Sequence, residues 1–219
     1  METTTSRTAL IIGATGLIGG QLLTKLLHTP YYDKVIVLTR RTLGITNTKL
    51  TEVIFNFDNP DAEKVKADDI FCCLGTTIKK AGSKDAFKKV DLEYPLTVAA
   101  LALKNGAQKY LIVSSVGADP KSGIFYSKVK GEVEQGLTAM KFPTLHIFHP
   151  SLLLGDREEA RMGEKVGEVL ATVFKPLMFG PLKKYRAIDS EKVANAMLAF
   201  AKKSETGVFI HDSAELQAF

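Results

Sequence analysis

Short apolar runs alternate with longer amphipathic stretches along most of the chain, and this alternation is its main architectural signal. Most of the runs are continuously apolar, as expected of strands in a parallel sheet that is covered on both faces. We predict seven strands, at residues 8–12, 34–38, 53–57, 69–74, 110–114, 145–149 and, shorter, 207–210.

Helical periodicity fills the intervals between these runs, at residues 17–28, 85–105, 125–140 and 190–203. Pro95 interrupts the second helix and Gly106 ends it, while Asp189 or Ser190 is a candidate N-cap for the last one. The repeated strand–helix–strand order predicts an α/β fold. We expect a doubly wound parallel sheet of the Rossmann type, with helices on both faces in three α/β/α layers.

The length of 219 residues suits one well-cored domain, so we predict a single domain over residues 1–219. A segment at residues 155–186, rich in charge and glycine, breaks the strand–helix rhythm. We expect it to form a small cap on the substrate side. No apolar run approaches the roughly 20 residues that a membrane-spanning helix requires.

A glycine-rich loop joins the first predicted strand to the first helix. Glycines at this place allow a tight turn and a close approach of the backbone to a pyrophosphate, whose charge the helix N-terminus stabilises. We therefore predict a dinucleotide site here, although a purely structural turn is the alternative. Its residues are Gly13, Thr15, Gly16, Leu17, Ile18 and Gly19.

The second strand is followed by Arg40 and Arg41 rather than by the acidic residue that binds the ribose hydroxyls in NAD-dependent proteins. Guanidinium groups pair with a 2′-phosphate, which a carboxylate would repel. The sequence therefore favours NADP(H), unless the two arginines are only solvated loop residues. By position, we expect Asn56 and Phe57 beside the adenine, and Leu74, Gly75 and Thr76 along the ribose and diphosphate.

Serines end the fifth strand, and a tyrosine and a lysine follow on the next predicted helix. Tyr126 and Lys130 are one turn apart and share a face. A phenol is a weak base at its ordinary pKa near 10, but a nearby ammonium favours its ionised form. We predict Tyr126 as the catalytic acid/base, Lys130 as its electrostatic partner and a ribose ligand, and Ser115 as the group that orients the substrate oxygen.

The chain carries a net charge of +5 and has a pI near 9.1, with lysines spread along the helical segments. We interpret this as a solvated surface and an anionic-cofactor site, and expect no nucleic-acid partner. The only cysteines, Cys72 and Cys73, are neighbours that would point to opposite faces of a strand, so we expect no disulfide and a cytoplasmic location. We expect no metal site, because His146 and His149 lack a cluster of further ligands.

Several segments of the chain resemble the atypical short-chain dehydrogenase/reductases, and within them the Tat-interacting-protein oxidoreductase group and its bacterial relatives. The most diagnostic are Cys-Cys-Leu-Gly-Thr-Thr at 72–77 and Val-Lys-Gly-Glu-Val-Glu at 129–134. The others are Gly13–Gly19, Val90-Asp91, Ser114-Ser115, Gly117-Ala118-Asp119, Tyr126 and Asp156-Arg157.

This resemblance implies a Rossmann domain that binds NADP(H), with a Ser–Tyr–Lys set at Ser115, Tyr126 and Lys130. It also implies that the segment containing Pro150 and Leu153 lines the nicotinamide end. The short chain after residue 155 leaves little room for a nucleotide-sugar domain, and the resemblance names no substrate.

Two functions remain open at this stage. The first is an NADP(H)-dependent oxidoreductase that acts on a small carbonyl or alcohol substrate. The alternative is a regulatory protein that senses NADP(H) and binds a protein partner without turnover. The sequence leaves the oligomeric state open.

Overall fold

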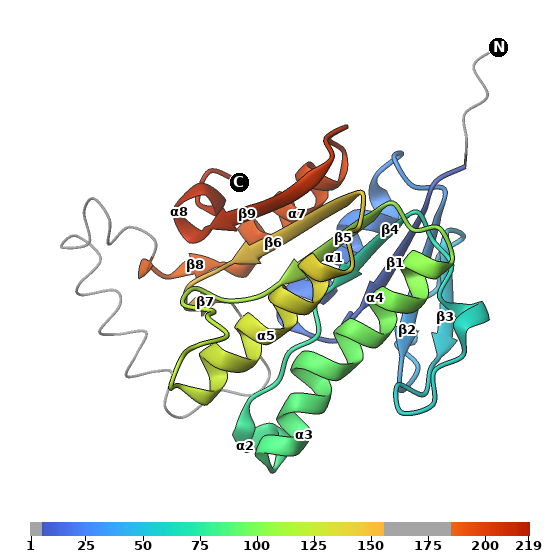
Figure 1. Cartoon of the computed structure of the whole chain (residues 1–219). Helices are drawn as coiled ribbons and strands as arrows, with labels where there is room; N and C mark the ends of the chain where they lie inside the picture. The colour runs from blue at the N-terminus through green and yellow to red at the C-terminus, as the bar shows by residue number, and fades with distance from the viewer. Residues whose placement is uncertain (1–5, 156–184) are drawn as a thin grey trace.

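A seven-stranded parallel sheet forms the centre of the computed structural model, which describes residues 6–155 and 185–219 (Figure 1). Its strand order is β3-β2-β1-β4-β5-β6-β9, so the chain winds outward in both directions from β1 and β4. All neighbouring strands run parallel. In this order the strands are Leu50–Ile54, Lys34–Thr39, Thr8–Ile12, Asp69–Cys72, Lys109–Val113, Thr144–His149 and Gly207–Asp212.

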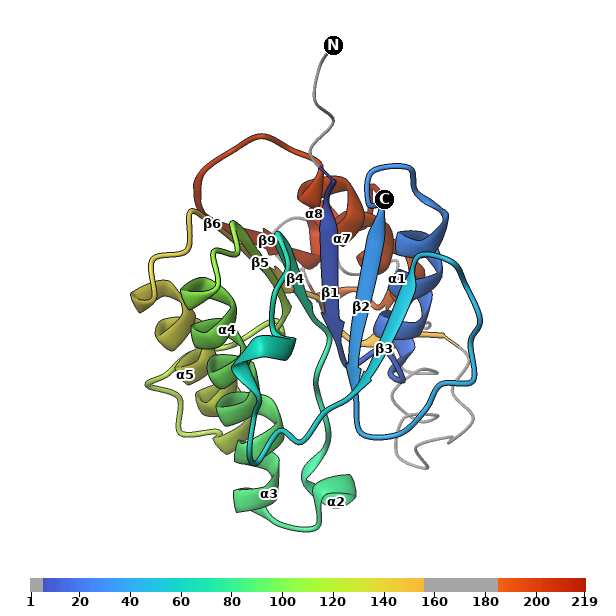
Figure 2. The same cartoon turned by 90° about the vertical axis from the view of Figure 1, so that its right-hand side faces the viewer.

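Helices cover both faces of the sheet and complete the three layers (Figure 2). The face that packs on α1 (Leu17–His28) and α7 (Ser190–Ala201) includes Ala9, Ile11 and Phe71. The opposite face packs on α4 (Tyr94–Lys104) and α5 (Phe125–Ala139), and it includes Leu10, Ile12 and Ile70. Successive residues of the same strands therefore enter different cores, which explains their uninterrupted apolar sequence. The predicted doubly wound fold is confirmed.

Smaller elements lie at the ends of the strands. They are the 3₁₀ turn η1 (Ala62–Lys64), α2 (Ile78–Ala81), α3 (Lys84–Lys88), the π-helical turn η2 (Lys89–Glu93), α8 (Ser213–Leu216), and a second sheet of β7 (Leu153–Leu154) and β8 (Ile188–Asp189). Most of the predicted cap, residues 156–184, lies outside the described residues, and the single-domain boundary stays a prediction. None of the helices described is long and apolar enough to cross a membrane.

Two predicted elements differ from the structure by more than the one or two residues by which other ends shift. The third strand runs over Leu50–Ile54 rather than over residues 53–57, and beyond its end the Asn56 side chain accepts a hydrogen bond from the Asp58 N–H and turns the chain. The single helix predicted over 85–105 is three segments, α3, η2 and α4. Pro95 lies in the first turn of α4, where its missing N–H costs no intrahelical bond.

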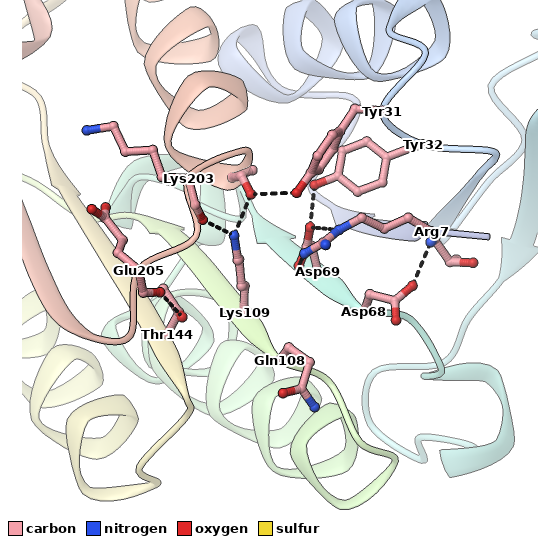
Figure 3. A network of polar contacts seen from close by, with 12 residues as sticks. Arg7, Tyr31, Tyr32, Asp68, Asp69, Gln108, Lys109, Thr144, Lys203 and Glu205 are labelled. Carbon is pink, nitrogen blue, oxygen red and sulfur yellow. Dashed lines mark hydrogen bonds and ion pairs between the residues drawn. The ribbon is translucent and has the colours of Figure 1, made fainter. Parts of the chain in front are cut away.

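A network of polar side chains closes the amino-terminal end of the sheet (Figure 3). The buried Asp69 carboxylate accepts two hydrogen bonds from Arg7, at 2.8 and 2.9 Å, and one from the Tyr32 hydroxyl at 2.5 Å. Next to it, Lys109 Nζ donates to the carbonyls of Ala201 and Lys203 at 2.6 and 2.5 Å. A cation thus caps the carbonyl end of α7, where the helix dipole is negative.

A buried histidine pair joins the last two strands of the sheet. His146 Nδ1 on β6 lies 3.0 Å from His211 Nε2 on β9, and His211 Nδ1 lies 3.1 Å from the Glu215 carboxylate. Burial, helped by the neighbouring His211, lowers the pKa of His146 from 6.5 to about 3. Burial also lowers the pKa of His211. The folded protein therefore keeps His146 neutral at a pH where the unfolded chain would protonate it.

We predict that the free energy of unfolding decreases as the pH falls from 6.5 towards 3. In this range His146 and His211 bind protons in the unfolded chain, whereas burial disfavours their protonated forms in the folded chain. Each such histidine contributes a slope of up to about 1.4 kcal/mol per pH unit. The His146→Asn variant should show a shallower slope in urea unfolding measured across this range. His28→Asn, at an exposed position on α1, is the control and should keep the original slope. An unchanged slope in His146→Asn would contradict the assignment.

Candidate functional site

The candidate site lies at the carboxyl ends of the strands, where β1 and β4 are neighbours although the connections leave them in opposite directions. Ligands of open α/β sheets bind at such a switch point. The structure brings most of the predicted site residues to this edge, because the loops after β1, β2, β3, β4, β5 and β6 all begin there.

The glycine loop crosses the loop that follows β4 at very short range. Gly13 has φ +84°, and a Cβ atom built there would lie 2.5 Å from the backbone carbon of Cys73. The Gly16 N–H donates to the Gly13 carbonyl at 3.0 Å, and Gly16 is the N-cap of α1. The first N–H groups of the helix therefore point out of its end, where they have no intrahelical acceptor. A backbone cradle with no side chain in the way and a positive helix end fits a diphosphate.

Most of the loop residues predicted around this cradle are found beside it. Thr15 is exposed, Ile18 and Gly19 are buried in the first turn of α1, and the side chain of Leu17 approaches Gly155. Leu74, Gly75 and Thr76 leave β4 next to Gly13. The glycine loop and the loop after β4 together form one continuous backbone surface.

Two basic side chains stand at the carboxyl end of β2, as predicted. Arg40 and Arg41 are both exposed, and the positive charge of Arg40 acts on the Tyr94 hydroxyl. Asn56 is exposed, whereas Phe57 is buried and its ring lies 5.2 Å from that of Tyr94. Phe57 thus packs against Tyr94 in the interior, and its ring does not face solvent.

Tyr126 and Lys130 lie on the same face of α5, but they differ in exposure. The Tyr126 side chain is 39% exposed, whereas Lys130 is 4% exposed. Lys130 Nζ lies 2.8 Å from Asp91 Oδ1, in an ion pair that is almost completely buried. Burial lowers the pKa of Lys130, but the contact with Asp91, together with the neighbouring Tyr126, outweighs burial and the pKa is raised. Lys130 therefore remains an ammonium group.

Asp91 also holds the loop that follows β4. Its Oδ2 accepts a hydrogen bond from the Thr76 N–H at 2.9 Å, and the residue itself is 1% exposed in the π-helical turn η2. One carboxylate thus connects the lysine of α5 to the loop predicted to run along the cofactor. The sequence alone gave Asp91 no role, although Val90-Asp91 is one of the segments that carry the family resemblance.

A second carboxylate joins the ends of β5 and β6 to α5. Glu134 Oε1 accepts a hydrogen bond from the Ser114 hydroxyl and lies 2.9 Å from His149 Nε2. Glu134 follows Lys130 by one helical turn, so the spacing of Tyr126, Lys130 and Glu134 was the signal that sequence reasoning missed. Ser114 and His149 are the neighbours of Ser115 and Pro150, and Glu134 therefore fixes both loops.

The Ser115 hydroxyl is one of several buried polar groups that the described residues leave without a hydrogen-bond partner. Its Oγ atom is buried and makes no hydrogen bond within residues 6–155 and 185–219. The Val116 N–H donates to the Pro150 carbonyl at 3.1 Å, which ties the loop after β5 to the loop after β6. Leu153 packs against the core from β7. A buried hydroxyl of this kind is suited to bind an oxygen of a ligand.

Close contact between α5 and the loop before it sets the spacing of the Ser115 and Tyr126 segments. A Cβ atom on Gly131 would lie 2.1 Å from the Pro120 nitrogen and 2.3 Å from the Asp119 carbonyl carbon. The Asp119 N–H donates to the Ser127 carbonyl at 3.0 Å. The absence of a side chain at Gly131 therefore permits this contact.

We predict that Gly131→Ala lowers the free energy of unfolding by about 1–3 kcal/mol, the usual cost of forcing extra atoms into a packed region. Denaturant unfolding measures the change. Gly123→Ala, in the same loop with no atom within 4 Å of the added methyl group, should be nearly neutral. Equal effects of the two substitutions would show that the close contact does not constrain the loop.

Comparison with known proteins agrees with this geometry. The sequence pattern of the NAD dependent epimerase/dehydratase family matches residues 9–212. Protein HTATIP2 of Rattus norvegicus is 39% identical over 165 residues, which cover 73% of this chain and 68% of that protein. Protein FMP52, mitochondrial, of Candida albicans is 31% identical over 207 residues, covering 90% and 89%. The predicted resemblance to the short-chain dehydrogenase/reductases and to the Tat-interacting-protein group is confirmed.

Solved structures with the same fold are more distant in sequence. MoeE5 in complex with UDP-glucuronic acid and NAD superposes with a TM-score of 0.72 at 15% identity, over 93% of this chain and 75% of that one. UDP-glucose 4-epimerase of Thermotoga maritima has a TM-score of 0.66 at 18% identity, over 94% and 76%. At this identity the likeness establishes the Rossmann fold.

The predicted cytoplasmic location is wrong by this comparison. The similar fungal proteins from Candida albicans, Scheffersomyces stipitis and Emericella nidulans are named as mitochondrial. The inference rested on two unpaired cysteines, and both are free thiols in the structure. Free thiols indicate only that a protein is not stabilised by disulfides, and this property does not single out the cytosol.

Proposed function

Because the chain belongs to the NAD dependent epimerase/dehydratase family, we propose that it is an NADP(H)-dependent oxidoreductase for a small carbonyl or alcohol substrate. The observation that carries this proposal is the buried ion pair of Lys130 and Asp91, one helical turn from Tyr126. Burying two charges is costly, and a fold that needed only a dinucleotide cradle would gain little from them. Such a pair is useful in an enzyme that needs a permanent positive charge beside Tyr126, because that charge stabilises the ionised phenol.

The residues at the carboxyl edge are suited to bind the dinucleotide along its whole length. The Gly13 cradle and the α1 N-terminus would hold the diphosphate, and Arg40 and Arg41 would pair with a 2′-phosphate. Asn56 and Phe57 would border the adenine, with Leu74, Gly75 and Thr76 along the ribose and diphosphate. Lys130 would reach the nicotinamide ribose, and Pro150 and Leu153 would border the nicotinamide.

The bound cofactor would supply or accept a hydride, and the protein would manage the proton at the substrate oxygen. The Ser115 hydroxyl would donate a hydrogen bond to that oxygen and orient it. Tyr126 would donate the proton in carbonyl reduction and accept it in alcohol oxidation. The Lys130 ammonium would stabilise negative charge on the tyrosine oxygen, and Asp91 would keep that ammonium charged.

We predict that NADPH binds more tightly than NADH, because two arginines, rather than an acidic residue that would receive a ribose hydroxyl, follow β2 in the sequence. The difference should disappear in the Arg40→Ala, Arg41→Ala double variant, which loses about 1.5–3 kcal/mol of NADPH binding for each charge-assisted pair removed. Calorimetric titration of both cofactors measures this. Equal affinities in the unmodified protein would refute the preference for NADP(H).

We predict that Tyr126→Phe lowers turnover of a carbonyl panel about 10²–10⁴-fold, as expected for loss of a general acid, without abolishing NADPH binding.

Asp91→Asn should move the alkaline limb of the pH–rate profile to lower pH, because the pKa of Lys130 falls when its buried partner loses its charge. Asp85→Asn, at an exposed position of α3, is the control and should leave the profile unchanged.

The comparison of Tyr126→Phe with the unmodified protein also separates the two functions left open by the sequence. Tight NADPH binding without turnover of any carbonyl, and an unaltered biological activity of Tyr126→Phe, would favour the cofactor-sensing regulator over the oxidoreductase.

A further inference from the structure

One short region of the described chain is strongly basic. Residues 78–89 contain five lysines and one acidic residue, Asp85, so this segment carries a net charge of +4. We expected lysines along the helical segments, and the structure places these five on α2, α3 and the start of η2. Figure 2 shows that α2 and α3 lie beyond the carboxyl ends of the strands, apart from the main body of the sheet.

The N-terminal end of α5 packs against this region and extends it. The rings of Phe87 and Phe125 lie 5.7 Å apart, and Lys84 Nζ lies 5.2 Å from the centre of the Phe125 ring. We call residues 78–89 and 121–128 together the basic tip. Tyr126 belongs to it, with its ring 5.8 Å from that of Phe87. The basic tip is therefore one packed unit beside the proposed catalytic residue.

Two isoleucines protrude from the basic tip among its lysines. Ile78 is 39% exposed and precedes Lys79, while Ile124 is 68% exposed and follows Lys121 by three residues. Neither Lys79 nor Lys121 pairs with an acidic side chain within residues 6–155 and 185–219. The tip thus combines exposed aliphatic side chains with uncompensated positive charge.

Other lysines of the basic tip have acidic neighbours. Lys88 and Lys128 each lie 4.0 Å from Glu132, and Lys89 lies 2.8 Å from Asp58. These contacts offset the charge of the three lysines concerned. Lys79 and Lys121 have no such acidic partner within the described ranges, and both lie close in sequence to the exposed isoleucines.

We propose that the basic tip docks the protein on an anionic lipid surface, with Ile78 and Ile124 inserted among the acyl chains and the lysines among the headgroups. Lysines are attracted to an anionic membrane within about a Debye length of its surface. Aliphatic side chains add to the binding free energy when they are buried at the boundary between lipid headgroups and acyl chains. A nucleic acid fits less well, because isoleucines do not stack on bases as aromatic side chains do. An acidic protein would use the lysines but would not require two isolated isoleucines.

Docking in this orientation places Tyr126 next to the lipid surface. A substrate dissolved in the membrane would then reach the proposed site without crossing water. This consequence depends on the proposed oxidoreductase function, whereas the docking itself does not.

The experiment is flotation of the full chain with vesicles of phosphatidylcholine, alone or mixed with phosphatidylserine, at low and at raised salt. We expect binding only to the mixed vesicles, weakened by salt. Lys79→Glu with Lys121→Glu should weaken it at least about tenfold. Lys34→Glu with Lys202→Glu makes the same charge change at exposed positions on the opposite end of the molecule, and should weaken binding far less. Ile78→Ser with Ile124→Ser should weaken binding with the charge unchanged.

Absence of binding to the mixed vesicles would overturn the proposal, as would equal losses in the two charge-reversed variants. Full binding by the isoleucine variant would overturn insertion. If the tip variant lost binding to duplex DNA and the unmodified protein ignored vesicles, the partner would be a nucleic acid. NADPH titration of every variant checks that each is folded. It also makes a failure of docking distinguishable from a failure of the oxidoreductase proposal.

Discussion

The buried contact between Asp91 and Lys130 is the constraint on which the geometry of the site depends. Breaking this ion pair would leave an uncompensated charge in the core, which is strongly destabilising. The two elements that carry the charges are therefore held together. Through the Thr76 N–H, the same carboxylate reaches a third element. The π-helical turn η2, the loop after β4 and helix α5 are therefore held in one arrangement by a single side chain, before any ligand is considered.

Glu134 repeats this arrangement one turn further along α5. It receives polar groups from the ends of β5 and β6, as Asp91 receives them from α5 and the loop after β4. The helix that carries the proposed acid/base is thus fastened at two levels to the strand ends that carry its partners. Such fastening gives a site its precision, because catalytic groups on rigid elements keep their positions better than groups on free loops.

Much of the fold was predictable because its strands are buried on both faces and read as apolar runs. The strand at residues 8–12 and the helix at 17–28 have the predicted boundaries. The third strand was misplaced because Phe55 and Phe57 are apolar for packing reasons after the strand has ended. The division of the helix before Pro95 was also missed, since a single π-helical turn contains too few residues to change the apolar pattern visibly.

The site was predictable where local sequence dictates local geometry, as in the glycine loop and the Tyr126–Lys130 spacing. The choice of partners was not, because Asp91 and Lys130 are far apart in the sequence and meet only through the tertiary fold. The same holds for the Arg7–Asp69–Tyr32 network, which has a separate consequence. It stabilises the amino-terminal ends of the strands, opposite the carboxyl ends where the candidate site lies. Residues of the site can therefore change, or a different ligand can bind, while these contacts continue to stabilise the sheet.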